Sequence, residues 1–279
     1  FISLSLNFLF NPLVLSADCQ AVSGSTVTFS TDCSVLVIEG DGSIVTINSG
    51  VTIDRAANLV VDTTSSTNTT ITNNGTIETT SSHYGLRHTG SGLITTLINN
   101  GSITSAARYG LSTGSSATIT TIENSGTISA GAHSGLRNYL GTIGTITNSC
   151  TISAVGKWGL YNNGTIEKIT NAGTISAGNT DNDSDYGFFN SGTIETITNS
   201  GTISATNRYG LYNSGTITNL TNTNTGTISA GTNYAIANTG SIGTFTNTGT
   251  LTPTGATGIS NQGSITTFNN SQGKSGSNP

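Results

Sequence analysis

The sequence predicts an all-β protein, a right-handed parallel β-helix (solenoid) of about eight coils of about 25 residues with an N-terminal cap. Two observations lead to this fold class. A phrase close to Asn-x-Gly-Thr-Ile recurs along the chain, and its glycine position falls at Gly75, Gly101, Gly126, Cys150, Gly173, Gly201, Gly226 and Gly249. Two more short apolar runs follow within each unit, so three short strands per coil are expected.

Other repeat folds fit this pattern less well. The apolar runs are rich in Thr and Ile and are broken by Asn and Gly, which disfavours helical repeats. A propeller blade needs about 40 residues, and a leucine-rich repeat carries several leucines at fixed positions. One unit holds too few apolar side chains to form its own core, so the units must stack. Right-handed coiling is expected because parallel connections prefer that hand.

Four segments are predicted along the chain. Residues 1–17 resemble a secretory signal with Leu15-Ser16-Ala17 as its cleavage site, and a buried N-terminal cap strand is the alternative. Residues 18–63 alternate irregularly between apolar and polar positions, and we expect them to form an N-terminal β cap over the first coil. The parallel β-helix repeats occupy residues 64–270, and a polar linker follows at residues 271–279.

The cysteines agree with export from the cell. Cys19 and Cys33 flank a polar segment and could close a loop of about 15 residues in a disulfide. Cys150 is the unpaired third cysteine. It replaces the glycine of the repeated phrase, and no surrounding motif marks it as a nucleophile, so we interpret it as a tolerated substitution.

Two columns of asparagine are expected at the corners of the solenoid. Side-chain amides in such a column can hydrogen-bond to those one coil above and below, and Asn tolerates left-handed corner conformations. The first column comprises Asn73, Asn99, Asn124, Asn148, Asn171, Asn199, Asn224 and Asn247. The second comprises Asn138, Asn162, Asn190, Asn213, Asn238 and Asn261.

A candidate binding groove follows from strand alternation around the repeated Tyr-Gly-Leu phrase. If Leu111 and its equivalents point inward, the glycine and the residues two before and two after it point outward. Glycine would then form the floor of a shallow groove, with basic and aromatic side chains on its banks. The candidate ligand-binding residues are Arg87, Arg108, Arg137, Lys157, Tyr161, Phe189, Arg208 and Tyr212. The structural alternative is that glycine only relieves crowding and that the rings pack on one another.

A further set of aromatic residues shares the inward parity of leucine. We therefore predict that they form a structural stack between coils rather than a ligand surface. They are Tyr109, Trp158, Tyr186, Tyr209 and Tyr234.

Catalytic and metal chemistry have little support in the sequence, and we predict neither catalytic residues nor a cofactor. Glu167 and Glu195 share a column one coil apart, which is a spacing that a retaining glycosidase could use, but no long loops surround them. Asp181, Asp183 and Asp185 alternate as an EF-hand loop begins, but the required glycine and final glutamate are missing. They are only a weak metal candidate. The formal net charge of -5 also argues against a nucleic-acid partner.

The repeats resemble those in the passenger domains of bacterial autotransporter (type V secreted) proteins. The phrases that carry the resemblance are Asn199-Ser200-Gly201-Thr202-Ile203-Ser204-Ala205 and Tyr209-Gly210-Leu211-Tyr212-Asn213, and it covers about residues 64–270. It implies a right-handed β-helix that is secreted or displayed on the surface of a Gram-negative bacterium, often as an adhesin. It also implies a C-terminal outer-membrane barrel, which would lie beyond Pro279.

The function expected from these observations is adhesion. The lateral face of the rod would bind host or environmental glycans or surface proteins, and repetition of weak contacts would add avidity. Two alternatives remain open at this stage. One is a β-helical polysaccharide lyase or hydrolase, which would need an acidic pair in a walled cleft. The other is a structural filament that associates with itself through its ends.

Overall fold

The computed structural model describes residues 19–38, 41–54, 61–62, 67–80, 83–178, 185–255 and 257–271. Within these residues the chain forms only β-strands and turns, and the strands pair in parallel in three long sheets. The predicted parallel β-solenoid is therefore confirmed. The predicted signal (residues 1–17) and most of the predicted linker (residues 271–279) lie outside the described residues.

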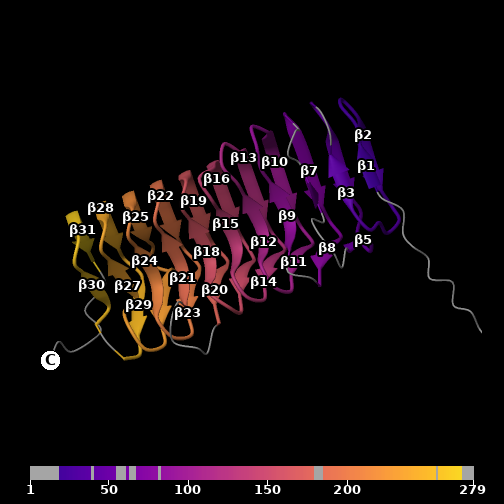
Figure 1. Cartoon of the computed structure of the whole chain (residues 1–279). Helices are drawn as coiled ribbons and strands as arrows, with labels where there is room; N and C mark the ends of the chain where they lie inside the picture. Colours follow the sequence, from indigo (N-terminus) through magenta and orange to yellow (C-terminus); the bar gives the residue numbers. More distant parts are fainter. Residues whose placement is uncertain are drawn as a thin grey trace, which may run out of the picture.

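Each coil contributes one strand to each sheet, and the next coil adds its strands alongside (Figure 1). We name the sheets A, B and C. Sheet A, whose central strands carry the Tyr-Gly-Leu phrase or a variant of it, consists of β1 (Cys19–Ala21), β3 (Leu36–Ile38), β6 (Val61–Asp62), β9 (Tyr84–His88), β12 (Tyr109–Thr113), β15 (Ser134–Asn138), β18 (Trp158–Asn162), β21 (Tyr186–Asn190), β24 (Tyr209–Asn213), β27 (Ile236–Asn238) and β30 (Ile259–Asn261).

Sheet B holds the longest strands, most of them seven residues, in β2 (Thr26–Phe29), β4 (Ile44–Ile47), β7 (Thr69–Asn73), β10 (Leu93–Asn99), β13 (Thr118–Asn124), β16 (Thr142–Asn148), β19 (Thr165–Asn171), β22 (Thr193–Asn199), β25 (Thr216–Asn222), β28 (Ser241–Asn247) and β31 (Ser264–Asn270). Sheet C, whose strands β14 to β26 carry the Thr-Ile-Ser-Ala phrase, consists of β5 (Thr52–Asp54), β8 (Thr76–Thr79), β11 (Ser102–Ser105), β14 (Thr127–Ala130), β17 (Thr151–Ala154), β20 (Thr174–Ala177), β23 (Thr202–Ala205), β26 (Thr227–Ala230) and β29 (Thr250–Pro253).

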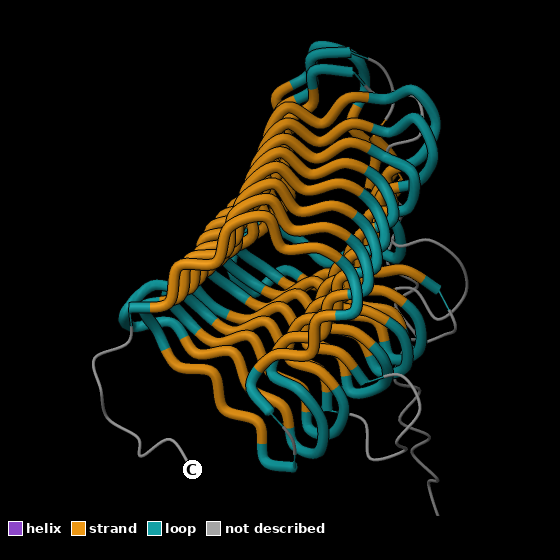
Figure 2. The backbone as a smooth tube through the Cα atoms, turned by 90° about the vertical axis from the view of Figure 1, so that its left-hand side faces the viewer, coloured by secondary structure: helices purple, strands orange, loops and turns teal. Residues whose placement is uncertain are grey.

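The core runs along the axis between the three sheets, which surround it on three sides in Figure 2. A regular coil supplies four large apolar side chains to it. In the coil of β13 to β15 these are Ile119 and Ile122 from sheet B, Ile128 from sheet C and Leu136 from sheet A, and each is 0% exposed. Each apolar residue packs on its counterparts one coil away, so the core is continuous and no single coil forms it alone.

The strands of residues 19–62 extend the same sheets instead of forming a separate layer. β1, β3 and β6 precede β9 in sheet A, β2 and β4 precede β7 in sheet B, and β5 precedes β8 in sheet C. These strands are two to four residues long, shorter than most strands of the later coils. The segment expected to be a cap is thus a set of irregular first coils.

A disulfide joins Cys19 to Cys33, the pair that the sequence singled out, with their Cα atoms 5.7 Å apart. Cys150 is free and exposed. We predict that reducing the disulfide lowers the local stability of the first coils by about 3 kcal/mol, because a loop of about 15 residues regains its freedom in the unfolded state. Hydrogen exchange would then speed up in β1 and β3 and stay unchanged in central coils such as that of β18. Equal protection before and after reduction would contradict this.

The two asparagine columns form buried hydrogen-bonded ladders, as predicted. Asn171 is 0% exposed, and its side-chain N–H donates to Asn199 Oδ1 at 2.7 Å and to the carbonyl oxygens of Gly173 and Thr202 at 3.2 and 3.1 Å. Its Oδ1 accepts from Asn148 at 2.7 Å. Every polar atom of the side chain therefore has a partner, which is what allows an amide to lie inside the solenoid.

Two details of the ladder prediction are wrong. The first column continues through Asn222 and not Asn224, because Asn199 donates to Asn222 Oδ1 at 2.9 Å and two extra residues are taken up in the following turn. The ladder asparagines also do not adopt left-handed conformations. The non-glycine residues with positive φ within the described segments are Asn68, Ser116 and Leu140, and none belongs to a ladder. The asparagines end their strands in extended conformation and act through their side chains.

Candidate functional site

The outer face of sheet A carries most of the aromatic and basic side chains of the repeats. Successive strands bring equivalent residues into adjacent columns. One column, next to the glycine on its N-terminal side, contains Tyr84, Tyr109, Ser134, Trp158, Tyr186, Tyr209 and Tyr234. A second, two residues after the glycine, contains Arg87, Ser112, Arg137, Tyr161, Phe189, Tyr212 and Ala237. We call these two columns the ring face.

All eight residues predicted to bind ligand lie on or beside this face. Arg87, Arg137, Tyr161, Phe189 and Tyr212 belong to the second column. The other three, Arg108, Lys157 and Arg208, lie just before strands β12, β18 and β24 at the edge of the first column.

The glycine of the Tyr-Gly-Leu phrase does not floor an outer groove, so that prediction is wrong. A Cβ atom on Gly110 would lie 2.7 Å from the carbonyl oxygen and 2.9 Å from the amide nitrogen of Ser129, which belongs to β14 of sheet C. The glycine therefore faces inward, where the backbones of sheets A and C nearly touch. Gly159 meets Ser176 of sheet C in the same way.

The predicted inward position of the tyrosine column is also wrong. The chain bends at the glycine, so the residue before it and the residue two after it both project outward. Tyr84, Tyr109 and Tyr209 are accordingly half-buried on the outer face, and only Tyr186 approaches full burial, at 9% exposure. Simple alternation failed because it assumes an unbent strand, whereas a glycine inside a strand often marks a bend or a close backbone approach.

The predicted stacking between coils is present. Tyr84 stacks on Tyr109, and Tyr186 on Tyr209, with ring centroids 5.3 Å apart in both pairs. The second column stacks in the same way through Tyr161, Phe189 and Tyr212, with centroids 5.2 Å apart at each step. Trp158 differs from the prediction, since its ring contacts Tyr161 and Phe189 of the second column at 4.6 and 5.5 Å.

Stacking along the rod has a consequence for binding. Within a run, each ring covers the faces of its neighbours, so a ligand can reach only the ring edges. The flat side of an aromatic ring becomes accessible only where a small residue interrupts a column. The second column has two such interruptions: Ser112 lies between Arg87 and Arg137, and Ala237 follows Tyr212. Each interruption coincides with a hollow in the surface.

The hollow at Ala237 has a volume of about 200 Å³, and we call it the ring hollow. Tyr212 and Tyr234 line it together with Arg208, and the polar groups of Asn238, Thr239, Ser260 and Gln262 complete its wall. Arg208 donates a hydrogen bond to the Tyr186 hydroxyl at 3.1 Å, and its guanidinium carbon lies 5.3 Å from the centre of the Tyr209 ring. Burial raises the pKa of Tyr186, so its hydroxyl stays protonated at neutral pH.

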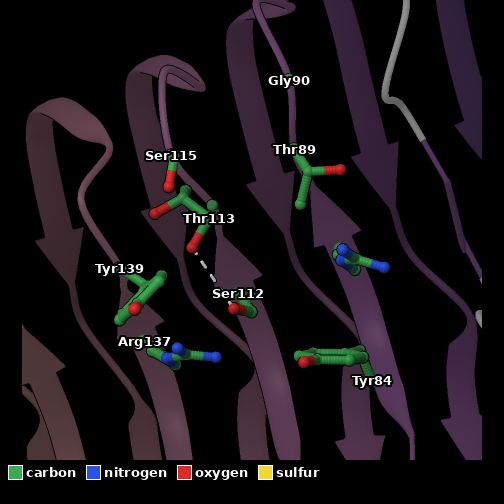
Figure 3. Close-up of a pocket in the computed structure, with 10 residues that line it drawn as sticks. Tyr84, Thr89, Gly90, Ser112, Thr113, Ser115, Arg137 and Tyr139 are labelled. Carbon is green, nitrogen blue, oxygen red and sulfur yellow. Dashed lines mark hydrogen bonds between the residues drawn. The ribbon is translucent and has the colours of Figure 1, made fainter.

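The hollow at Ser112 is larger, about 340 Å³, and we call it the arginine hollow (Figure 3). Two arginines of the second column, Arg87 and Arg137, line it with the rings of Tyr84 and Tyr139. Hydroxyl groups supply the rest of its polar lining, from Thr89, Ser112, Thr113 and Ser115. None of its lining residues carries a carboxylate.

Burial and the basic side chains on this part of the ring face lower the pKa of His133. His133 stacks on Tyr109 with centroids 5.3 Å apart. Its pKa is lowered, first by burial and then by the positive charges of Lys157, Arg108 and Arg137, so the imidazole is neutral at pH 7. Burial raises the pKa of Tyr109, while Arg137 partly opposes that rise.

The other candidate sites lie apart from the ring face. Glu167 and Glu195 are exposed and lie one coil apart on sheet B, flanked by the paired residues of β19 and β22, and they line neither hollow. Asp181 and Asp183 fall outside the described residues, whereas Asp185 is buried and accepts the Asn207 backbone N–H at 2.8 Å. Within the described segments, no group of three His, Cys, Asp or Glu residues is placed to hold a metal ion.

The sequence indicated Arg87, Arg137, Arg208 and Tyr212 but not the other residues that shape the hollows. Tyr84 and Tyr234 were absent from the predicted ligand set, as were Ser112, Tyr139 and Ala237. A signal for two of them exists, because Ser112 and Ala237 are small residues at column positions that neighbouring coils fill with Arg or a ring. Tyr139 lies outside the phrase, just after β15, so the repeat pattern gave no reason to select it.

A scan of the sequence against protein-family models found no match, and comparisons with curated proteins and with solved structures found none. Over the described residues, no helix is long and apolar enough to cross a membrane.

Proposed function

We propose that this β-solenoid is a secreted or cell-surface binding protein that acts in adhesion and holds saccharides against its ring face. The observation that carries the proposal is the ring hollow, where the second column of rings ends at Tyr212 and the next coil presents only Ala237. Sugar rings pack their C–H faces on aromatic rings and direct their hydroxyls to polar groups at the margin. The hollow offers both features, and saccharide sites generally combine them.

The polar groups around the ring hollow suit a ligand with many hydroxyls. The Tyr212 hydroxyl lies 3.3 Å from Thr239 Oγ1, and Ser260 and Gln262 lie along the same wall. Hydroxyls and amides can each donate or accept, so they fit the mixed donors and acceptors of a sugar. A chain with only 8% charged residues has few other means of recognition on its surface.

The autotransporter-like repeats support the cellular setting of this proposal. Passenger domains of that family hold a solenoid outside a Gram-negative cell, where a long stack provides reach. Many weak contacts along one face then add avidity for a glycan or for a glycosylated surface protein. The outer-membrane barrel that the resemblance implies belongs to the same proposal.

The two other functions considered have less support. A polysaccharide-degrading enzyme needs paired carboxylates in a walled cleft, but Glu167 and Glu195 are exposed on sheet B and line neither hollow. Association through the ends would be favoured by an exposed apolar terminal coil. Of the large apolar side chains in β30 and β31, Phe268 alone is exposed, at 47%, and this is the fraction that remains after it stacks on Phe245 of the preceding coil.

The saccharide proposal is tested by changing the ring hollow in two opposite ways. Tyr212→Ala removes the ring, and Ala237→Tyr extends the ring column across the hollow. We expect each variant to bind about two- to twelvefold more weakly to the neutral oligosaccharides that the wild type selects from a glycan array, because a ring contact contributes about 0.5–1.5 kcal/mol. Titration calorimetry measures the loss.

The control is Phe268→Ala, which removes an aromatic ring from sheet B without touching the ring face. It should bind glycans as the wild type does. The proposal fails if the array shows no glycan binding. It also fails if Tyr212→Ala and Ala237→Tyr, with unchanged circular dichroism, bind as tightly as the wild type.

A further inference from the structure

The arginine hollow differs in chemistry from the ring hollow. Its position follows from the strand register, since Arg87, Ser112 and Arg137 occupy equivalent places in β9, β12 and β15. Adjacent parallel strands are about 4.8 Å apart, so the two arginine backbones lie about 10 Å from each other with a short side chain between them. Ser112 is only 3% exposed and does not fill the space above it.

The guanidinium of Arg137 is held in place by aromatic rings. Its carbon lies 4.6 Å from the centre of the Tyr109 ring and 4.1 Å from that of Tyr139. Contacts of this kind cover the flat faces of the group and leave its N–H edges for hydrogen bonds. Figure 3 shows the Arg137 side chain beside Tyr139, pointing toward Tyr84 on the opposite wall. Its donors are thus ordered before any ligand arrives.

The electrostatic surroundings favour a negative ligand. Arg87 and Arg137 line the hollow, and its other lining residues carry no charge. Arg108 and Lys157 lie close enough to affect the protonation of His133. The chain has only eight Lys and Arg residues and a net charge of -5, so this concentration of positive charge departs from the rest of the molecule.

We infer that the arginine hollow binds the anionic group of an acidic saccharide, a carboxylate or a sulfate ester, with the attached sugar ring held between Tyr84 and Tyr139. Arg137 forms charge-assisted hydrogen bonds to the anion, and its planar fork matches the oxygens of such groups. Thr89 and Ser115, which also line the hollow, supply hydroxyl partners for the sugar. This inference rests on the saccharide function proposed above and specifies which saccharide the face prefers.

The test uses the full chain and three oligosaccharides of equal length: a hexamer of galacturonic acid, a sulfated heparin hexasaccharide and uncharged cellohexaose. Calorimetric titration of the wild type should show at least tenfold tighter binding of one acidic probe than of cellohexaose. The acidic probe that binds identifies the anion as carboxylate or sulfate. Raising the salt concentration should weaken that binding and leave the binding of cellohexaose unchanged.

Two variants attack the site by different routes. Arg137→Gln removes the charge and the fork. Ser112→Tyr keeps every charge and fills the hollow with a ring. The same residue type already occurs at the equivalent column position two strands further along the sheet, as Tyr161. Each should weaken binding of the acidic probe at least tenfold. Lys168→Gln, which removes an exposed positive charge from sheet B, is the matched control and should have no effect.

The inference is overturned if Arg137→Gln or Ser112→Tyr binds the acidic probe as the wild type does, or if Lys168→Gln weakens binding as much. It is also overturned if poly-glutamate competes as well as the acidic hexamer, because the hollow would then hold acidic protein segments. If the binding of neutral glycans in the same experiment still depends on Tyr212, the saccharide function stands and only this inference has failed. The loss of all glycan binding would instead remove the saccharide function itself.

Discussion

Asn171→Asp is expected to lower the free energy of unfolding by about 3 to 5 kcal/mol, the cost of a buried charge without a compensating partner. The two N–H groups of the Asn171 amide are directed to three acceptors, Asn199 Oδ1 and the carbonyl oxygens of Gly173 and Thr202. A carboxylate has no proton to donate. Replacement would therefore place negative oxygen against three acceptors at a position that is 0% exposed. The midpoint and slope of urea unfolding measure the loss.

The pH dependence of this variant distinguishes the cost of burying a negative charge from the cost of a simple packing defect. Burial would raise the folded-state pKa of the new carboxyl above its ordinary value of about 3.9. Between these two pKa values the folded chain holds a proton that the unfolded chain has released, so stability falls as pH rises through that window. Asn171→Asp should thus lie closest to the wild type at about pH 4 and fall furthest behind at neutral pH.

Asn219→Asp provides the control, since it makes the same chemical change at an exposed position of β25. Its effect should stay within about 0.5 kcal/mol, as is usual for surface substitutions. A loss at Asn171→Asp as small as that at Asn219→Asp would mean that the ladder does not hold the coils together.

Gly159→Ala is the second substitution with a large expected effect, about 3 kcal/mol, at the upper end of overpacking costs. The added methyl would lie 2.6 Å from the Gly187 carbonyl oxygen and 2.7 Å from both the amide nitrogen and the carbonyl oxygen of Ser176. These are backbone atoms of a neighbouring coil and of sheet C, so no side-chain rotation relieves the contact. Either sheet A moves away from sheet C or the strand loses its bend.

Gly178→Ala is the matched control for this substitution. The nearest atom to a methyl there is the Ala154 carbonyl oxygen at 3.7 Å, an ordinary van der Waals distance. Its unfolding midpoint should stay near that of the wild type, while that of Gly159→Ala falls clearly. If the two variants unfold alike, the close approach of sheets A and C does not limit the size of this residue.

The core and the ladders could be predicted from the sequence because the residues that form them recur once per coil. Ile and Leu recur in register, and the asparagines follow at fixed distances. The repeated phrase predicts Asn224 in the first column, but the register is set by the ladder, in which Asn199 donates to Asn222 and Asn222 donates to Asn247. An extra pair of residues in a turn shifts the phrase but not the ladder.

The ring face could be predicted only in part. Strand alternation predicted that the side chains of Arg87, Arg137 and Tyr212 lie on the outer face of sheet A, and they do. It failed for Tyr109 because the bend at Gly110 depends on the approach of Ser129 from another sheet, a contact that no local pattern contains. The repeat pattern also did not predict the hollows, since they form where Ser112 and Ala237 have smaller side chains than the Arg or aromatic residues at the same position in neighbouring coils.

The constant rise of the coils gives the rod the properties of a ruler. Ser112 lies in β12 and Ala237 in β27, five strand steps apart along sheet A. At about 4.8 Å per step, the two hollows are separated by about 24 Å. A saccharide held at both hollows must span that length, so one chain could engage both only above a minimum number of sugars. Inserting or deleting one repeat between them would change this threshold by about 4.8 Å without altering either hollow.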